Sequence, residues 1–524
     1  MKSRFLIHIV SIGFLAPLAI VVQLAAQDAD TPLKKAQHHH YKFIDLGTLG
    51  GPVSYFSGGG IGNLLLNNRG VVAGYADTST PDPYAHAPNC FNADCFLSHT
   101  FRWQNGVLTD LGALPGTNSS AASGINARGW VAGYSENGEI DPLTGSPETN
   151  AVLWKDGQII NLGTLGGNES LAISVKDGGQ VVGLATINAM PDPFSFLGAP
   201  THTFTWKNGV MQDLGTLGGP DSFPSAGGIN ERNGLVAGGS YTTSTPNSIA
   251  DPCGQNVPTM DPFLWRNDRM IDLGTLGGTC GFAVVVNNRG QVVGQSDLVG
   301  DLTAHPFLWD QGVLTDLGTL GGTFGSASWI NDAGEIVGGA TNQNDQAFLA
   351  FLWKDGVMTN LGGVDNDPCS AANSINAKSQ VVGISETCDF FTVQRAFLWD
   401  DGQIVDLNTL IPQNSSLDLL AGLNINDRGE ILGVGVPPGA PPNTDLFGHL
   451  FLLIPCDRDH LDAEGCDYSL VDETATATDS AKPATQMGNT AKSALPPDAI
   501  RQLMQPPGRR SKLWYRGLGA QSPK

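Results

Sequence analysis

The stretch FLWDQGVLTDLGTLGG, residues 307–322, decides the fold because its parts recur along most of the chain. Self-similarity of this kind is the signature of a repeat architecture. The phrase DLGTLGG or a variant of it begins at eight positions, which are Asp45, Asp110, Asn161, Asp213, Asp272, Asp316, Asn360 and Asp406. The FLW phrase or a near match ends at Trp103, Trp154, Trp206, Trp265, Trp309, Trp353 and Trp399, with Leu453 in the eighth place.

Each repeat also contains two turn signals. A third phrase, of the form INxxGxVVG, puts Asn first and Gly fourth, as in Asn331 to Gly334, and this order suits a type I turn. One residue after the Trp, pairs such as Asp355-Gly356 stand between apolar runs, which is a strong signal for a two-residue hairpin. Each repeat therefore predicts four short strands, roughly SGIN, VVG, AFLW and VxxDLG.

The two ends of the repeat region complement each other. Tyr41 to Gly47 contain a DLG strand without an FLW partner, and Leu450 to Leu453 contain an FLW-like strand without a DLG partner. Joining them completes an eighth blade and removes the exposed sheet edges of an open array. We therefore predict an all-β fold, a closed β-propeller of eight four-stranded blades whose last blade is closed by the N-terminal strand. An open β-solenoid is the alternative.

The segments outside residues 41–455 have other compositions. Residues 1–26 resemble a signal peptide, because Lys2 and Arg4 precede an apolar run and small residues precede Gln27. An uncleaved membrane anchor is the alternative. Residues 27–40 are predicted to be a leader, and residues 456–524 a disordered tail whose basic end is either solvated or anchors to an anionic surface. We expect a secreted protein, extracellular or periplasmic.

Cysteine usage agrees with export. The chain has 8 cysteines that fall in neighbouring couples, and an oxidising destination favours their pairing. The predicted disulfides are Cys253–Cys280, Cys369–Cys388, Cys90–Cys95 and Cys456–Cys466.

Charge is distributed unevenly along the repeats. The formal net charge of -22 disfavours nucleic acid and anionic lipid as partners. The connections between the VVG and FLW phrases, which should share one face, contain 16 Asp or Glu residues and a single basic residue, Arg395. Either this acidic face only keeps the protein soluble, or it captures Ca²⁺, a cationic protein or another extracellular ligand. The candidate Ca²⁺ ligands are Glu136, Glu139 and Asp141, and separately Asp365 and Asp367.

Catalytic signatures do not emerge from the sequence. We find no phosphate-binding glycine loop, HExxH motif, nucleophile elbow or EF-hand loop. The histidines that stand two residues before a Phe belong to different repeats, so we expect structural roles; they are His99, His202, His305 and His449. We predict an exported, non-enzymatic binding or scaffold protein that uses the acidic loop face. The alternative is an extracellular polysaccharide hydrolase or lyase with a carboxylate pair in the same loops.

The repeat phrases resemble the HAF-type extracellular repeat of exported bacterial proteins. The resemblance rests on His202-Thr203-Phe204, His305-Pro306-Phe307 and Ala396 to Trp399 with the DLG phrases that follow, and it spans Tyr41 to Leu453. It implies export and a repeat fold, and it implies no reaction. Arg102 and Thr205 inside the FLW phrase depart from the pattern, as does the missing eighth Trp.

Overall fold

The computed structural model describes residues 41–56, 63–83, 90–92, 94–116, 118–195, 197–247, 257–388, 393–440, 448–460 and 466. All of them belong to one compact unit, residues 38–524. The expected signal peptide, the leader, Cys253 and most of the C-terminal tail lie outside the described residues. Within the described ranges, no helix combines the length and the hydrophobicity needed to cross a membrane.

The described residues form strands β1 to β32, grouped here by sheet. The first four sheets contain β2 (Gly50–Tyr55), β3 (Val72–Pro81), β4 (Phe96–Gln104), β5 (Val107–Gly112); β6 (Ser120–Ile125), β7 (Val131–Ile140), β8 (Pro147–Lys155), β9 (Gln158–Gly163); β10 (Ser170–Val175), β11 (Val181–Thr186), β12 (Thr201–Lys207), β13 (Val210–Asp213); β14 (Ser222–Ile229), β15 (Val236–Pro246), β16 (Pro258–Arg266), β17 (Arg269–Asp272). The last four contain β18 (Gly277–Val286), β19 (Val292–Leu298), β20 (Ala304–Asp310), β21 (Val313–Asp316); β22 (Gly321–Ile330), β23 (Ile336–Asn342), β24 (Phe348–Lys354), β25 (Val357–Gly362); β26 (Cys369–Ile375), β27 (Val381–Glu386), β28 (Gln394–Asp400), β29 (Gln403–Asp406); β30 (Asp418–Ile425), β31 (Ile431–Val436), β32 (His449–Pro455), β1 (Tyr41–Asp45). Short 3-10 turns are η1 (Gln343–Asp345), η2 (Val364–Asn366), η3 (Leu407–Leu410) and η5 (Arg458–His460).

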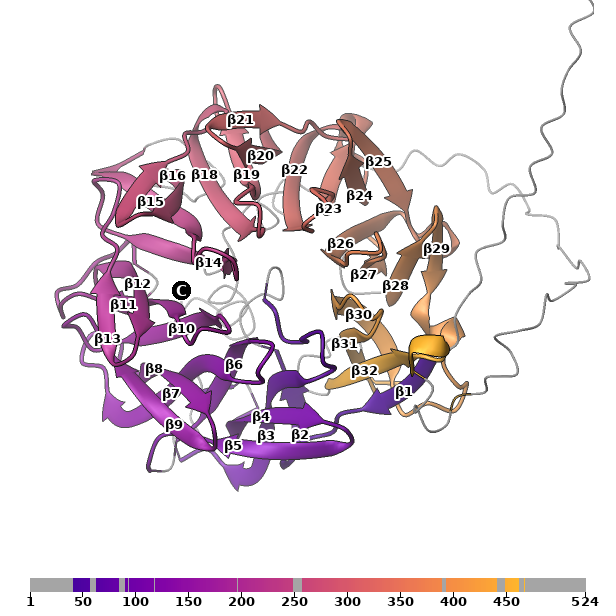
Figure 1. Cartoon of the computed structure of the whole chain (residues 1–524), viewed down its shortest axis with the longest axis horizontal. Coiled ribbons are helices and arrows are strands. Elements are labelled where there is room, and N and C mark those ends of the chain that lie inside the picture. The colour runs from indigo at the N-terminus through magenta and orange to yellow at the C-terminus, as the bar shows by residue number, and fades with distance from the viewer. Residues whose placement is uncertain are drawn as a thin grey trace, which may run out of the picture. The chain divides into compact units, whose positions relative to one another are not determined.

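These strands form eight antiparallel four-stranded blades around a ring, so the predicted β-propeller is confirmed (Figure 1). Within a blade, the SGIN strand pairs with the VVG strand, then the FLW strand, then the DLG strand, as β10 to β13 show. The SGIN strands lie toward the centre of the ring and the DLG strands toward its rim (Figure 1). Single parallel bridges also link some neighbouring blades, such as Gly227 with Val285.

The ring is closed by the two ends of the repeat region. Strand β1 pairs antiparallel with β32, with Phe43 opposite Leu453. The order β1-β32-β31-β30 makes the last blade, so the predicted closure by the N-terminal strand is confirmed. The backbone N–H of Leu46 donates to the carbonyl of Leu450 at 2.9 Å, which extends the pairing beyond the strand.

The Asn of each IN turn ties its blade to the next one. In Asn331, Oδ1 accepts the backbone N–H groups of Ala333 and Glu335, both at 3.0 Å, and Nδ2 donates to the carbonyl of Asn376 at 3.0 Å. Asn426 makes the same bond to the carbonyl of Asn67 and so closes the ring. The other members of this Asn ring are Asn67, Asn126, Asn230, Asn287 and Asn376, and Lys176 takes the place in the β10–β11 turn.

Close packing explains two further repeat residues. A Cβ at Gly133, the Gly of a VVG phrase, would lie 2.0 Å from the carbonyl oxygen of Ala121 on the neighbouring bulged strand. Only Gly fits there, although its φ is ordinary. The Phe of the FLW phrase, where present, is 0% exposed, because it fills the space between sheets; these are Phe101, Phe204, Phe263, Phe307, Phe351, Phe397 and Phe451.

The DLGTLGG phrase is a structural loop between blades. Oδ1 of Asp316 accepts the N–H of Gly318 at 2.7 Å, and the Thr319 hydroxyl donates to the carbonyl of Gly322 at 2.8 Å. Leu317 is buried against the next blade. The same bonds recur in other copies, including those at Asp45, Asp213 and Asp272. The most repeated phrase of the chain therefore serves the fold.

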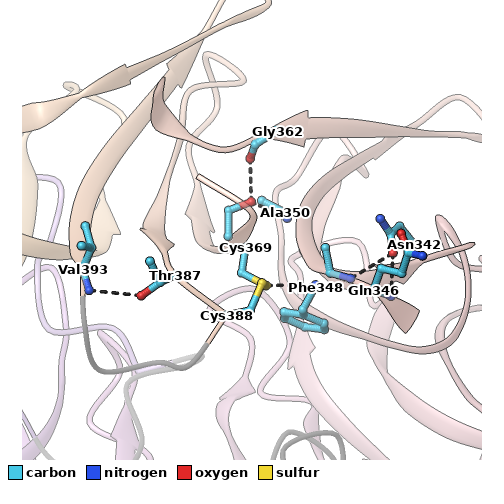
Figure 2. Close-up of a disulfide and its surroundings, with 11 residues drawn as sticks. Asn342, Gln346, Phe348, Ala350, Gly362, Cys369, Thr387, Cys388 and Val393 are labelled. Atoms are coloured by element: carbon cyan, nitrogen blue, oxygen red, sulfur yellow. Dashed lines mark hydrogen bonds between the residues drawn. A yellow bond between two sulfur atoms is a disulfide. The ribbon is translucent and has the colours of Figure 1, made fainter. Parts of the chain in front are cut away.

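Three of the predicted disulfides are confirmed, namely Cys90–Cys95, Cys369–Cys388 and Cys456–Cys466. Figure 2 shows the second, in which Cys369 opens β26 and Cys388 follows β27, while the N–H of Phe348 donates to the Cys369 sulfur at 3.3 Å. Cys280 is also disulfide-bonded, and its predicted partner Cys253 lies outside the described residues. Such pairing is typical of exported proteins.

Candidate binding face

The acidic connections join the second and third strands of each blade, and they leave the blades at the same end as the DLG loops. We call this end the connection face. Part of it is strand rather than loop: β7 and β8 stay paired as far as Ile140 opposite Pro147. The sequence predicted only a strand around VVG here. The buried part of β7 ends at Ser135 and Glu136, and the strand then continues as an exposed extension to Ile140.

The predicted trio Glu136, Glu139 and Asp141 does not form one cluster. Glu136 is 1% exposed and its Oε2 accepts the N–H of Ser119 at 2.6 Å. Asp141 is also 1% exposed and accepts from the N–H of Leu143 and the hydroxyl of Thr144. Glu139 is exposed, as are its neighbours Gly138 and Ile140 at the end of strand β7. Glu136 thus accepts from the residue that precedes β6, and Asp141 accepts from its own loop.

The structure instead groups the carboxyls across blade boundaries. Burial first, and then Asp82, raises the pKa of Glu136 to about 7. Burial also raises the pKa of Glu169 to about 7, with Asp141 and Glu148 adding to the shift, although bonds from Thr149 oppose it. The sequence analysis missed Glu169 as a partner of Asp141, because the two lie in different repeats and become neighbours only when blades stack.

A third carboxyl group adjoins an aromatic cluster. Burial and then a hydrogen bond with Asp94 raise the pKa of Asp77 to about 8. The Tyr55 hydroxyl lies 3.0 Å from Asp94 and 3.4 Å from Asp77, and its ring stacks on Tyr75 at 5.1 Å. Further ring contacts lead from Tyr75 through Phe91 to Tyr134.

This pair does not have the geometry of a glycosidase. Asp77 is 0% exposed and already accepts bonds from the N–H of Val53 and the hydroxyl of Ser98. Two carboxyls that share a hydrogen bond also lie closer together than the roughly 5–10 Å that separates the acid and its partner in glycoside hydrolases.

One residue position explains why so many of these acids are buried. The third residue after the VVG glycine is Asp77, Glu136, Asp297 or Glu386 in some blades and Thr186 or Thr341 in others. In each kind, the side chain meets the start of the first strand of its blade: Glu136 accepts from Ser119, and the Thr341 hydroxyl accepts the N–H of Phe324 at 3.0 Å. A sequence search for this fixed offset could have identified these acids as structural.

Asp365 and Asp367, the second predicted pair, lie beside the one basic residue of the connections. Arg395 Nη1 is 3.3 Å from Asp365 and 3.7 Å from Asp367. The hydroxyl of Ser385 also donates to Asp367 at 2.9 Å. Throughout the described ranges, no group of three or more His, Cys, Asp or Glu side chains is arranged to hold a metal ion. Ca²⁺ binding at these residues stays a prediction.

The repeat histidines pair with the Asp of the DLG phrase. His99, His202, His305 and His449 each place Nδ1 at 2.8–3.0 Å from a carboxylate oxygen on the adjacent strand. The hydrogen bond that His449 donates to Asp45 raises the pKa of His449. Burial acts to raise the pKa of Asp45, but this bond and the one from the Gly47 N–H lower it. These pairs connect the two outer strands within single blades.

Comparisons with known proteins support no assignment of family. No protein-family profile and no curated protein sequence matches the chain. Among solved structures, the chain is similar to the β-propeller domain of the Trilobed protease from Pyrococcus furiosus, with 10% identity and a TM-score of 0.40 over 68% of this chain and 97% of that one. It is also similar to the acylaminoacyl peptidase of Pyrococcus horikoshii, with 11% identity and a TM-score of 0.38 over 74% of this chain and 58% of that one.

Proposed function

We propose that the protein is an exported, non-enzymatic binding protein whose connection face takes a cationic ligand. The observation that supports this most is the grouping of carboxyls on three neighbouring blades: Asp77 with Asp94, Glu136 near Asp82, and Glu169 near Asp141 and Glu148. Burial is the main cause of the raised pKa values of Asp77, Glu136 and Glu169, and repulsion from the neighbouring carboxylates adds to it. A cation approaching the exposed members would relieve that repulsion.

The buried acids hold the loops, so the contact itself falls to exposed ones. Glu139 is exposed and Glu148 is half-buried at the end of the β7–β8 hairpin. The Asn137 amide reaches Glu148 at 3.1 Å, which positions this carboxylate without neutralising it. A basic segment of a partner protein fits such a rim better than a single ion does, because no three ligands converge within the described residues.

The test compares two variants with equal changes in charge. Glu139→Gln with Glu148→Gln removes charge from the connection face, and Asp355→Asn with Asp401→Asn removes it from exposed hairpin turns at the opposite end. Binding of a fluorescent decalysine peptide should weaken about tenfold in the first variant, as expected for the loss of charge-assisted contacts, and stay unchanged in the second. Ca²⁺ should compete with the peptide. Equal weakening in both variants would mean that only net charge matters, and the proposal would be wrong.

A further inference from the structure

The β16–β17 hairpin departs from the other hairpins at its position. In six blades the second turn residue is a Gly with positive φ, namely Gly106, Gly157, Gly209, Gly312, Gly356 and Gly402. In the β16–β17 turn, Asn267 has φ 52 and Asp268 has φ 56. A residue other than Gly is strained when its backbone φ is positive. Residues held in such strained conformations cluster at functional sites.

The same hairpin also places two arginines side by side on its paired strands. Arg266 is directly opposite Arg269 in the strand register, and both are exposed. The corresponding pairs in other blades contain one basic residue at most, such as Lys207 opposite Val210 and Lys354 opposite Val357. Like charges directly opposite each other destabilise a strand pair. Neither arginine forms an ion pair with any other residue that the structure describes.

These residues line an open, shallow pocket. Its walls are Arg266, Asn267, Arg269 and Ile271. Two guanidinium groups and one carboxamide supply N–H donors in planar arrays, which suit the oxygens of a carboxylate or sulfate. Ile271 adds an exposed apolar wall.

We propose that the β16–β17 hairpin is a binding site for a carboxylate or sulfate group. The anion would lie between the two guanidinium groups and neutralise the repulsion that the strand register imposes on them. The apolar wall would contact the carbon skeleton of an acidic sugar where the group is attached to one. This site is at the hairpin end of the blades, opposite the connection face, so it is independent of the function proposed above.

Titration calorimetry at about 10 mM ionic strength, where charges are screened least, tests the proposal. The probes are sodium sulfate, sodium glucuronate and glucose. Both anions should bind and glucose should not. Arg266→Gln and Arg269→Val should each weaken anion binding about tenfold or more. Arg269→Val installs the residue that Val107, Val210, Val313 and Val357 already supply in other blades, so the hairpin should still fold.

Matched variants make the result decisive. Lys207→Gln changes a basic residue at the equivalent position of another blade and should leave the affinities unchanged. Asp268→Gly restores the Asn-Gly turn, so it should raise the melting temperature and keep or strengthen anion binding. Tighter binding of glucuronate than of sulfate, lost in Ile271→Thr, identifies an acidic sugar as the source. Absence of anion binding, or equal weakening in Lys207→Gln and Arg269→Val, would overturn the proposal.

Discussion

At the residue scale, single polar side chains form hydrogen bonds with backbone N–H and C=O groups that have no partner within the strands. Each Asn of the Asn ring accepts two N–H groups of its own turn and donates across the blade boundary, as Asn287 does to the carbonyl of Asn331 at 3.0 Å. The Asn is almost fully buried, so its loss would leave several polar groups without partners. The sequence indicated the turn from Asn and Gly, but the bond to the next blade needs the stacked geometry.

Two substitutions test the Asn ring in opposite directions. Asn331→Ala removes the bonds to Asn376 and Glu335 and should lower the free energy of unfolding by about 2 kcal/mol. Lys176→Asn supplies the amide that the ring lacks and should add about 1 kcal/mol through a bond to the carbonyl of Asn230. Lys176→Ala is the control for loss of the lysine alone. Urea unfolding measures all three, and a Lys176→Asn variant no more stable than Lys176→Ala would contradict the role of the amide.

The buried carboxyls predict how stability depends on pH. Because the pKa of Glu136 is about 7 in the folded chain, against an ordinary value of 4.5, the folded state binds the extra proton between these values. The contribution of Glu136 to the free energy of unfolding should therefore be greatest below pH 4.5. It should fall as the pH rises to about 7, by at most about 3 kcal/mol. The raised pKa of His449 acts in the same direction above pH 6.5.

Glu136→Gln should flatten this dependence, since the amide still accepts the Ser119 N–H but cannot ionise. The variant should melt higher than the natural protein at pH 8 and show a smaller difference at pH 5. Glu139→Gln, an exposed change on the same strand, serves as the control and should reproduce the natural profile. Identical profiles for both variants would show that Glu136 is not held protonated.

At the scale of the element, the repeat phrases predicted strand type and order well. Turn chemistry specified where the VVG strands begin and where the FLW strands end, because a turn with Asn first and Gly fourth precedes VVG and an Asn-Gly or Asp-Gly pair follows FLW in several repeats. The length of β7 was not predictable in this way, since pairing of Ile140 with Pro147 depends on what the hairpin packs against. The carboxyl groups that interact were not predictable from the sequence for a related reason. Asp82 interacts with Glu136, and Asp141 with Glu169, only across the boundary between two blades.

The disulfide between β26 and β27 gives an element-scale prediction. Cys369→Ala with Cys388→Ala opens a link over 19 residues and removes an acceptor for the Phe348 N–H. The free energy of unfolding should fall by about 3 kcal/mol, because the unfolded chain gains freedom. Cys90→Ala with Cys95→Ala opens a link over 5 residues and should cost only about 2 kcal/mol. Guanidinium unfolding of both variants measures the difference, and the reverse order would refute it.

At the scale of the whole molecule, closure makes the eight blades mutually dependent. The bond from Asn426 to Asn67 and the pairing of β1 with β32 connect the last repeat to the first. Ser416 and His449 both reach Asp45, so the closing strand is held by side chains as well as by its backbone. Closure was predictable from the sequence because the first and last repeats lack complementary phrases. The exposed acids at one end and the arginine hairpin at the other then give the ring two chemically different ends.

Removal of the closing strand tests this dependence. A chain without residues 41–47 leaves β32 with an unpaired edge and deprives His449 of Asp45. We expect a large loss of thermal stability and concentration-dependent association in sedimentation velocity, because an exposed edge recruits other strands. A synthetic peptide of residues 41–47 added in excess should restore the monomer and raise the melting temperature by mass action, since it can add to the same edge. A peptide with Phe43→Asp is the control and should do neither. If the shortened chain melts like the full one and stays monomeric, the ring does not depend on its closing strand.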